Sequence, residues 1–180
     1  VGLYYSHLNL LPHLKELIAA LRKKGQEFAH IIKMGRTQLQ DAVPMTLGQT
    51  FNGFASILED ELKHLDEAAA DFLTVNMGAT AIGTGICAEP GYSEKCVKAM
   101  CDITGFEFKI ADDLVGATSD TSCMVGYSSA LRRVCVKMNK ICNDLRLLAC
   151  GPRCGLSEFN LPAMQPGSSI MPGKVNPVIP

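Results

Sequence analysis

The sequence predicts an all-α protein, an elongated bundle of long helices. Three long stretches repeat apolar residues every three or four positions, which is the spacing of one helix face. Short breaks rich in glycine and proline separate these stretches. No segment shows sustained alternation of apolar and polar residues between hairpin turns, so we expect no β-sheet.

The first helix is expected to run from about residue 6 to residue 33. Ser6 or Asn9 can cap it, and Pro12 is tolerated in an opening turn. Gly25 weakens this helix by roughly 1 kcal/mol relative to alanine. The expected apolar face consists of Leu10, Leu14, Leu17, Leu21, Phe28 and Ile32.

The second helix is expected over residues 46–75, and its apolar positions follow a period close to 3.6. They are Leu47, Phe51, Phe54, Leu58, Leu62, Leu65, Ala69 and Phe72. A shorter helix is expected near residues 93–103.

The third long helix is expected over residues 119–148, with basic residues on its solvated face. Its apolar stripe is Met124, Leu131, Val134, Met138, Ile141, Leu145 and Leu148. The chain supplies too few long helices to cover all three stripes. We therefore expect the remaining apolar faces to pack against other subunits of an oligomer.

Composition excludes several classes of partner. The net charge is -1 and no basic stripe is present, so nucleic acid is not expected as a partner. No apolar run reaches the roughly 18 residues of a membrane span. The eight cysteines form no C-x-x-C pair, which argues against a metal site. We expect free thiols in a reducing cytoplasm, and a disulfide framework is the alternative.

Two breaks between helices carry polar groups that could bind a ligand. Residues 167–177 hold two serines, a lysine and an asparagine between glycines and prolines, a set that suits a small carboxylate. Residues 35–44 hold neutral hydrogen-bonding groups. On composition alone a solvated loop is the favoured interpretation of both segments. Residues 78–85 lack the G-K-[ST] of a phosphate loop.

These segments resemble the fumarase/aspartase superfamily. Residues 167–177, GSSIMPGKVNP, are similar to its signature loop, and residues 35–44, GRTQLQDAVP, are similar to its GRTHxQxAxP segment. GATAIGTG at 78–85 and CNDLRLLACGPRCGL at 142–156 fit the same superfamily. The resemblance covers the whole chain. It implies that residues 1–180 are the central helical domain of a lyase, with the N-terminal and C-terminal domains outside this chain.

The branch of the superfamily is indicated by Gln38, which stands where fumarases and some aspartases have histidine. Gln38 followed by LQDAVPMTLGQ resembles the ammonia-lyases. This implies reversible elimination of ammonia from L-aspartate to give fumarate, a carbon-nitrogen lyase reaction without cofactor or metal. It also implies a cytoplasmic homotetramer that acts on a small dicarboxylate, with no nucleic acid or membrane as partner. Fumarate hydratase and a non-catalytic oligomerisation scaffold remain alternatives.

The resemblance also implies roles for individual residues. Ser168, the first serine of the signature loop, would take the Cβ proton of the substrate and form a doubly charged aci-carboxylate. Gln38 would hydrogen-bond the amino group. The groups expected to bind the carboxylates are Thr37, Ser169, Lys174 and Asn176. Further substrate-binding segments of the superfamily are missing here, so we expect the chain to be inactive by itself.

Overall fold

The computed structural model describes residues 1–180, which fold mainly into helices and form two small two-stranded sheets. The helical prediction is confirmed, whereas the expectation of no sheet is wrong. The chain divides into two compact units. Unit 1 comprises residues 1–15 and 60–132, and unit 2 comprises residues 16–59 and 133–180.

The first helical stretch begins and ends earlier than predicted. It consists of α1 (Gly2–Tyr5), the π-helix η1 (Ser6–Leu10) and α2 (Leu11–Glu27). Ser6 is not a cap, because its hydroxyl donates to the Gly2 carbonyl at 2.9 Å and also bonds the Tyr127 hydroxyl. The buried apolar side chains are Leu3, Leu11, Leu14, Ile18 and Leu21, so Leu14 and Leu21 are buried as predicted and the other predicted apolar positions are not.

The second long helix, α3 (Leu47–Ala70), begins where its sequence supplies a capping box. Gln49 N donates to Thr46 Oγ1 at 3.1 Å, and Thr46 N donates to Gln49 Oε1 at 2.9 Å. The predicted stripe is confirmed as a buried face at Leu47, Phe51, Phe54, Leu58, Leu65 and Ala69. The helix ends five residues before the predicted end, and the 3-10 helix η2 (Asp71–Leu73) and strand β3 (Thr74–Val75) follow.

Glycines let α2 and α3 approach closely within unit 2. A Cβ on Gly48 would lie 2.3 Å from the Gly25 carbonyl oxygen, and one on Gly25 would lie 2.6 Å from Asn52 Oδ1. Next to this contact, Gly48 N donates to the Phe28 carbonyl at 3.0 Å. The glycine at position 25, which weakens an isolated helix, therefore permits the packing of α2 against α3.

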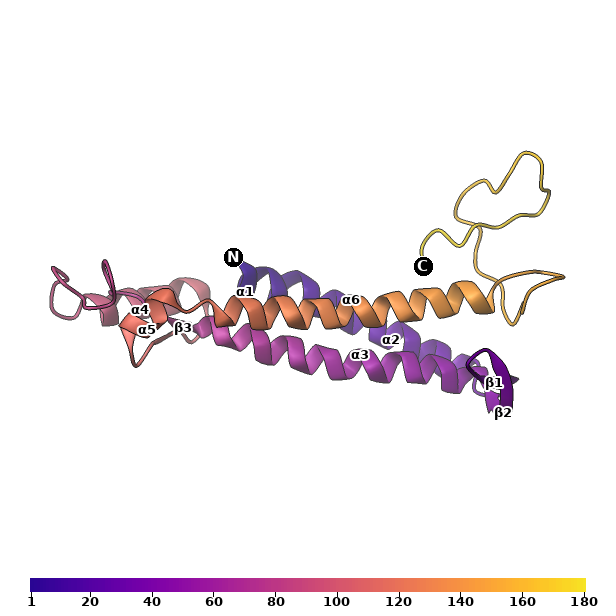
Figure 1. Ribbon diagram of the computed structural model, residues 1–180, viewed down its shortest axis with the longest axis horizontal. Helices are drawn as coiled ribbons and strands as arrows, with labels where there is room; N and C mark the ends of the chain where they lie inside the picture. Colours follow the sequence, from indigo (N-terminus) through magenta and orange to yellow (C-terminus); the bar gives the residue numbers. More distant parts are fainter. The chain divides into compact units, whose positions relative to one another are not determined.

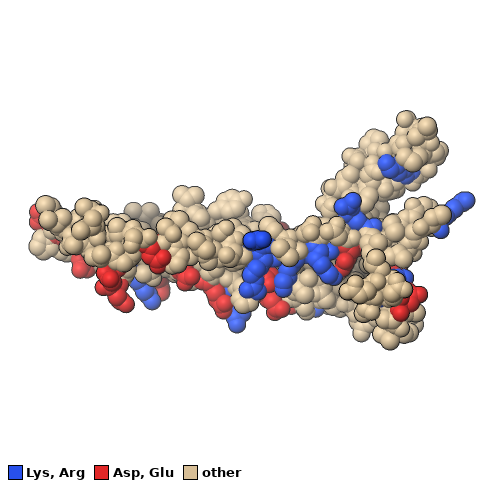
Figure 2. All heavy atoms as spheres, viewed as in Figure 1, with Lys and Arg blue, Asp and Glu red and all other residues tan.

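The third long helix, α6 (Ser122–Leu148), starts three residues later than predicted. Asp120 accepts hydrogen bonds from Ser122 N at 2.9 Å and Ser122 Oγ at 2.8 Å, and these bonds hold the pKa of Asp120 below its usual value. Val134, Ile141 and Leu148 are buried as predicted, but Met124 is exposed. Figure 2 shows Lys and Arg side chains gathered over the second half of α6, which agrees with the predicted solvated face.

The remaining elements belong to unit 1. Helix α4 (Tyr92–Thr104) lies where the short helix was expected, between Gly91 and Gly105, which both have left-handed backbone. Strand β3 pairs in parallel with β4 (Lys109–Ile110), and the short helix α5 (Leu114–Ser119) follows. A Cβ on Gly83 would lie 2.4 Å from Val115 N, so residues 78–85 pack against α5. None of the helices combines the length and apolar content needed to cross a bilayer. All eight cysteines are free.

Candidate functional site

Residues 32–46, which include the polar break 35–44, form an antiparallel hairpin of β1 (Ile32–Thr37) and β2 (Gln40–Thr46). The hairpin lies between α2 and α3 along the chain (Figure 1). Its two turn residues, Gln38 and Leu39, both have positive φ, 51° and 62°. Positive φ at both central positions is the geometry of a type I′ turn, which normally selects asparagine and glycine. The backbone of this turn is therefore strained by its own side chains.

Strand β1 carries an irregularity next to the turn. The register with β2 shifts between Met34 and Arg36, which places a bulge at Gly35. A Cβ at Gly35 would lie 2.9 Å from the Val43 carbonyl oxygen, so a side chain there would push the strands apart. Bulges change the direction in which neighbouring side chains point. Arg36, directly after the bulge, pairs with Asp41 across the hairpin at 3.3 Å.

Glu158, from the segment after α6, binds two cations of β1. Lys33 Nζ lies 2.7 Å from Glu158 Oε2, and Arg36 Nη1 donates to Glu158 Oε1. The Glu158 side chain is only 12% exposed. This burial acts to raise the pKa of Glu158, but the hydrogen bonds from Lys33 and Arg36 outweigh it and hold the pKa below its usual value.

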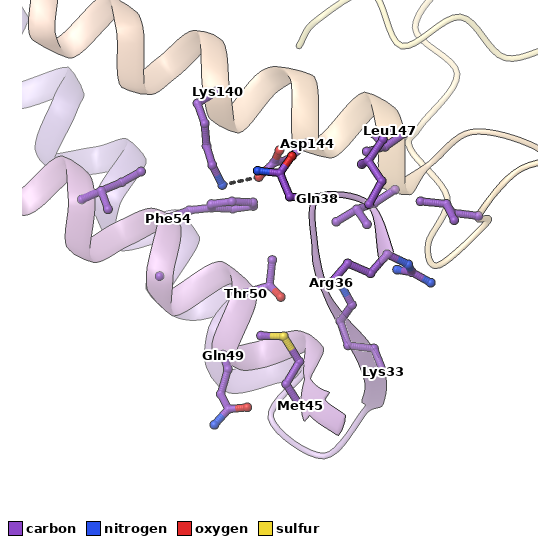
Figure 3. A pocket seen from close by; sticks show the side chains of 15 residues that line it. Lys33, Arg36, Gln38, Met45, Gln49, Thr50, Phe54, Lys140, Asp144 and Leu147 are labelled. Atoms are coloured by element: carbon purple, nitrogen blue, oxygen red, sulfur yellow. Dashed lines mark hydrogen bonds and ion pairs between the residues drawn. The ribbon is translucent and has the colours of Figure 1, made fainter. Parts of the chain in front are cut away.

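A cavity of about 690 Å³ lies beside the hairpin within unit 2. Gln38 lines it together with Lys140 and Asp144 of α6, which form an ion pair. Lys140 Nζ also lies 5.1 Å from the centre of the Phe54 ring. In Figure 3 the Gln38 side chain points toward the Lys140–Asp144 pair, while the Arg36 side chain extends in another direction. The cavity therefore combines apolar walls with an amide and a charge pair.

The segment after α6 folds back on the end of that helix. Glu158 N donates to the Leu148 carbonyl at 2.9 Å, and Ser157 N donates to the Cys150 carbonyl at 2.9 Å. A Cβ on Gly155 would lie 2.4 Å from the Cys150 carbonyl oxygen, so this turn is tight. Ser157 has a positive φ of 47°. These contacts fix the backbone of Glu158 to the C-terminal end of α6.

The polar loop 167–177 is closed at its base. Asn176 Nδ2 donates to the Gly167 carbonyl at 3.4 Å, and a Cβ at Gly167 would lie 1.8 Å from the Lys174 carbonyl oxygen. At its start, Ile170 N and Met171 N both donate to Ser168 Oγ at 3.3 Å. Two amides thus converge on one serine oxygen.

The structure brings the six predicted site residues into two groups. Ser168, Ser169, Lys174 and Asn176 share the closed loop, and Lys174 lines a second cavity of about 460 Å³ between that loop and residues 149–161. Thr37 and Gln38 lie at the hairpin, where Gln38 lines the first cavity. Gln38 and Lys174 thus line separate cavities of unit 2.

Sequence reasoning missed Glu158, Lys140 and Asp144. Glu158 is an isolated acid in an irregular segment, and the predicted helical face made Lys140 a solvated residue. The one available signal was the pair of cations three residues apart at Lys33 and Arg36, which requires a counter-charge once both are partly buried.

Comparison with known proteins places this chain in a family. The model of a family described as "Lyase" matches residues 3–180. The chain belongs to this lyase family. The superfamily resemblance seen in the sequence is thereby confirmed.

Relatives of this lyase chain include an aspartate ammonia-lyase of Pseudomonas aeruginosa, 58% identical over 100% of the chain and 38% of the relative. The lyase chain thus spans well under half the length of this curated relative. Among solved structures, a fumarate lyase:delta crystallin from Brucella melitensis is 57% identical with a TM-score of 0.90, over 92% of the chain and 36% of that protein. A class II fumarase from Schistosoma mansoni is 34% identical with a TM-score of 0.93, over 98% of the chain and 40% of that protein.

Proposed function

We propose that this chain supplies part of the active site of an aspartate ammonia-lyase, which converts L-aspartate reversibly into fumarate and ammonia. The observation that carries the proposal is the convergence of Ile170 N and Met171 N on Ser168 Oγ, each at 3.3 Å. Hydrogen bonds donated to an oxygen favour its charged form. The same loop therefore provides a base and part of the environment that the base requires.

Elimination requires removal of a weakly acidic proton from the carbon next to a carboxylate. In the proposed reaction Ser168 Oγ takes the Cβ proton, and the electron pair of that bond moves into the adjacent carboxylate. The resulting dianion collapses as the Cα–N bond breaks, the C=C bond forms and ammonia leaves. Because negative charge grows on the substrate, most of the rate enhancement must come from groups that stabilise that charge.

The other predicted residues supply those groups. The second serine and nearby amides of the loop bind the carboxylate beside the lost proton. Lys174 provides a fixed positive charge for the other carboxylate, together with Asn176 and Thr37. Gln38 cannot donate a proton in general acid catalysis, so its amide serves as a hydrogen-bond partner of the amino group. This chemistry needs no cofactor.

A complete site on this scheme requires more than one copy of the chain. Lys174 of the loop and Gln38 of the hairpin line separate cavities of unit 2, which supports a site assembled from several subunits. Val136 and Leu147 of α6 are 61% and 39% exposed, and oligomerisation would cover such apolar side chains. We propose a homotetramer in a reducing compartment such as the cytoplasm, where eight free cysteines persist.

A direct comparison of substrates tests this function. The full-length protein is expected to release fumarate from L-aspartate and to leave L-malate unchanged. The identity of 58% to an aspartate ammonia-lyase, against 34% to a fumarase, favours that outcome. Turnover of malate but not aspartate would establish the hydratase alternative. Turnover of neither substrate would favour the non-catalytic oligomerisation scaffold.

A further inference from the structure

We propose that Glu158 is a positioning residue for substrate binding, which holds hairpin β1–β2 so that Thr37 and Gln38 keep their binding geometry. This inference rests on the proposed function, because it assigns to these two residues a contact with the substrate. Glu158 itself lines neither of the two cavities described above. It acts through the cations that it binds.

The charges around Glu158 determine what holds this part of β1. One carboxylate faces two cations of the same strand, and the Lys33 and Arg36 side chains are only 11% and 21% exposed. The side chain of Asp41, the other carboxylate that pairs with Arg36, is 72% exposed. An exposed ion pair contributes little, whereas removal of one partner from a shielded pair leaves the other charge uncompensated. Glu158 is thus the main counter-charge that fixes this part of β1.

The Glu158 backbone is fixed by hydrogen bonds. The bonds from Glu158 N to the Leu148 carbonyl and from Ser157 N to the Cys150 carbonyl, both 2.9 Å, attach it to the end of α6. Leu156 N also donates to Cys150 Sγ at 3.3 Å. A residue held in this way can transmit the position of a long helix to the hairpin. An acidic residue on a flexible segment could not transmit that position.

The turn of the hairpin is strained. Gln38 and Leu39 keep positive φ without the help of glycine, so the turn persists only because its surroundings impose it. Arg36 lies one residue before the turn pair Thr37↔Gln40 and is joined to Glu158. Loss of that link would let the turn relax toward less strained conformations and move Thr37 and Gln38 from the substrate.

The test uses Glu158→Gln in the full-length protein, because glutamine keeps the size and removes the charge. We expect the KM for aspartate to rise by about tenfold or more, the order expected for a displaced binding group. The kcat should stay within about threefold of wild type, because Ser168 lies outside the altered hairpin. Amide hydrogen exchange of residues 32–46 should accelerate at the same time.

Glu59→Gln is the matched control, since Glu59 also pairs with an arginine of unit 2, Arg22, at 2.6 Å. Its pair contacts neither β1 nor β2, so we expect unchanged KM and unchanged exchange at residues 32–46. Glu158→Asp keeps the charge on a shorter side chain and should raise KM less than Glu158→Gln. This second variant provides the test if Glu158→Gln does not fold.

Either of two results would overturn the inference: unchanged KM and exchange in Glu158→Gln, or a fall in kcat at constant KM. If only Glu158→Asp folds, it should raise the KM and accelerate hairpin exchange relative to Glu59→Gln. A KM and an exchange rate equal to those of the wild type or of Glu59→Gln would overturn the inference. If the wild-type protein does not act on aspartate, the proposed function fails separately. In that case faster exchange of the hairpin in Glu158→Gln still supports the positioning of β1 by Glu158.

Discussion

Gly48 of α3 meets the backbone of Gly25 in α2, where an added Cβ would lie 2.3 Å from the Gly25 carbonyl oxygen. Because that oxygen belongs to the backbone, it cannot rotate away as a side chain would. We expect Gly48→Ala to lower the free energy of unfolding by about 1–3 kcal/mol, as overpacking does. Urea denaturation of the full-length protein measures this loss.

Gly53 of the same helix provides the opposite case. A Cβ at Gly53 would meet nothing within 4 Å. Alanine is a better helix former than glycine by roughly 1 kcal/mol, so Gly53→Ala should raise the free energy of unfolding. Equal effects of the two substitutions would show that helix propensity, and not the Gly25–Gly48 contact, determines stability here.

The capping box at the start of α3 gives a second prediction. Thr46 Oγ1 accepts from Gln49 N at 3.1 Å, and this pairing satisfies an amide that the helix itself cannot bond. We expect Thr46→Ala to cost about 1 kcal/mol of stability and Thr46→Ser to cost little, since serine also caps helices well. A thermal melt of each variant distinguishes them. Similar losses for serine and alanine would mean that the threonine methyl group, not the hydroxyl, stabilises this helix end.

The ion cluster of Glu158 predicts how stability depends on pH. Its pKa in the folded protein lies below the usual value, so the folded state binds this proton less tightly than the unfolded state. The stabilisation is therefore fully present above the unfolded pKa, roughly 4.3, and is lost as pH falls through the lower folded pKa. Glu158→Gln should destabilise the protein clearly at neutral pH and progressively less as pH falls below the unfolded pKa.

Comparison of the wild type and Glu158→Gln by chemical denaturation at several pH values checks this dependence. The difference in unfolding free energy should shrink steadily below the unfolded pKa of glutamate. A difference that stays constant from neutral to acidic pH would indicate that packing of the Glu158 side chain, and not its charge, stabilises the cluster.

The separation of the two polar groups predicts that residues 1–180 alone are inactive. Gln38 and Lys174 line different cavities of one chain. We expect the isolated chain to release no fumarate from L-aspartate, as followed by the ultraviolet absorbance of fumarate. Measurable turnover by the isolated chain would mean that one chain, or an oligomer of this segment alone, holds a working site.

The helices could be predicted from the sequence because their apolar residues repeat with the period of a helix. The stripe from Leu47 to Ala69 is buried almost throughout, and α4 lies within one residue of its expected bounds. Helix ends were less predictable. Residues 28–33 continue the apolar pattern of α2, but the amides of Leu47 and Gly48 bond the carbonyls of Ile31 and Phe28, and the chain turns there.

The hairpin could not be predicted from local patterns. Its turn is Gln38–Leu39, whereas asparagine and glycine normally mark such turns, and Pro44 lies within β2 although proline disfavours strands. The signature loop was found by resemblance, since its composition alone favours a solvated loop. Glu158 was missed because its role depends on contacts with residues more than a hundred positions away.

Replacement of Ser168 by alanine in the full-length protein is the most direct test of the proposed chemistry. The substitution removes only the oxygen on which Ile170 N and Met171 N converge, so the helices should keep their circular dichroism signal. We expect kcat for aspartate deamination to fall by at least about a hundredfold, the contribution of a positioned general base. A folded Ser168→Ala protein that deaminates aspartate at the wild-type rate would contradict the account.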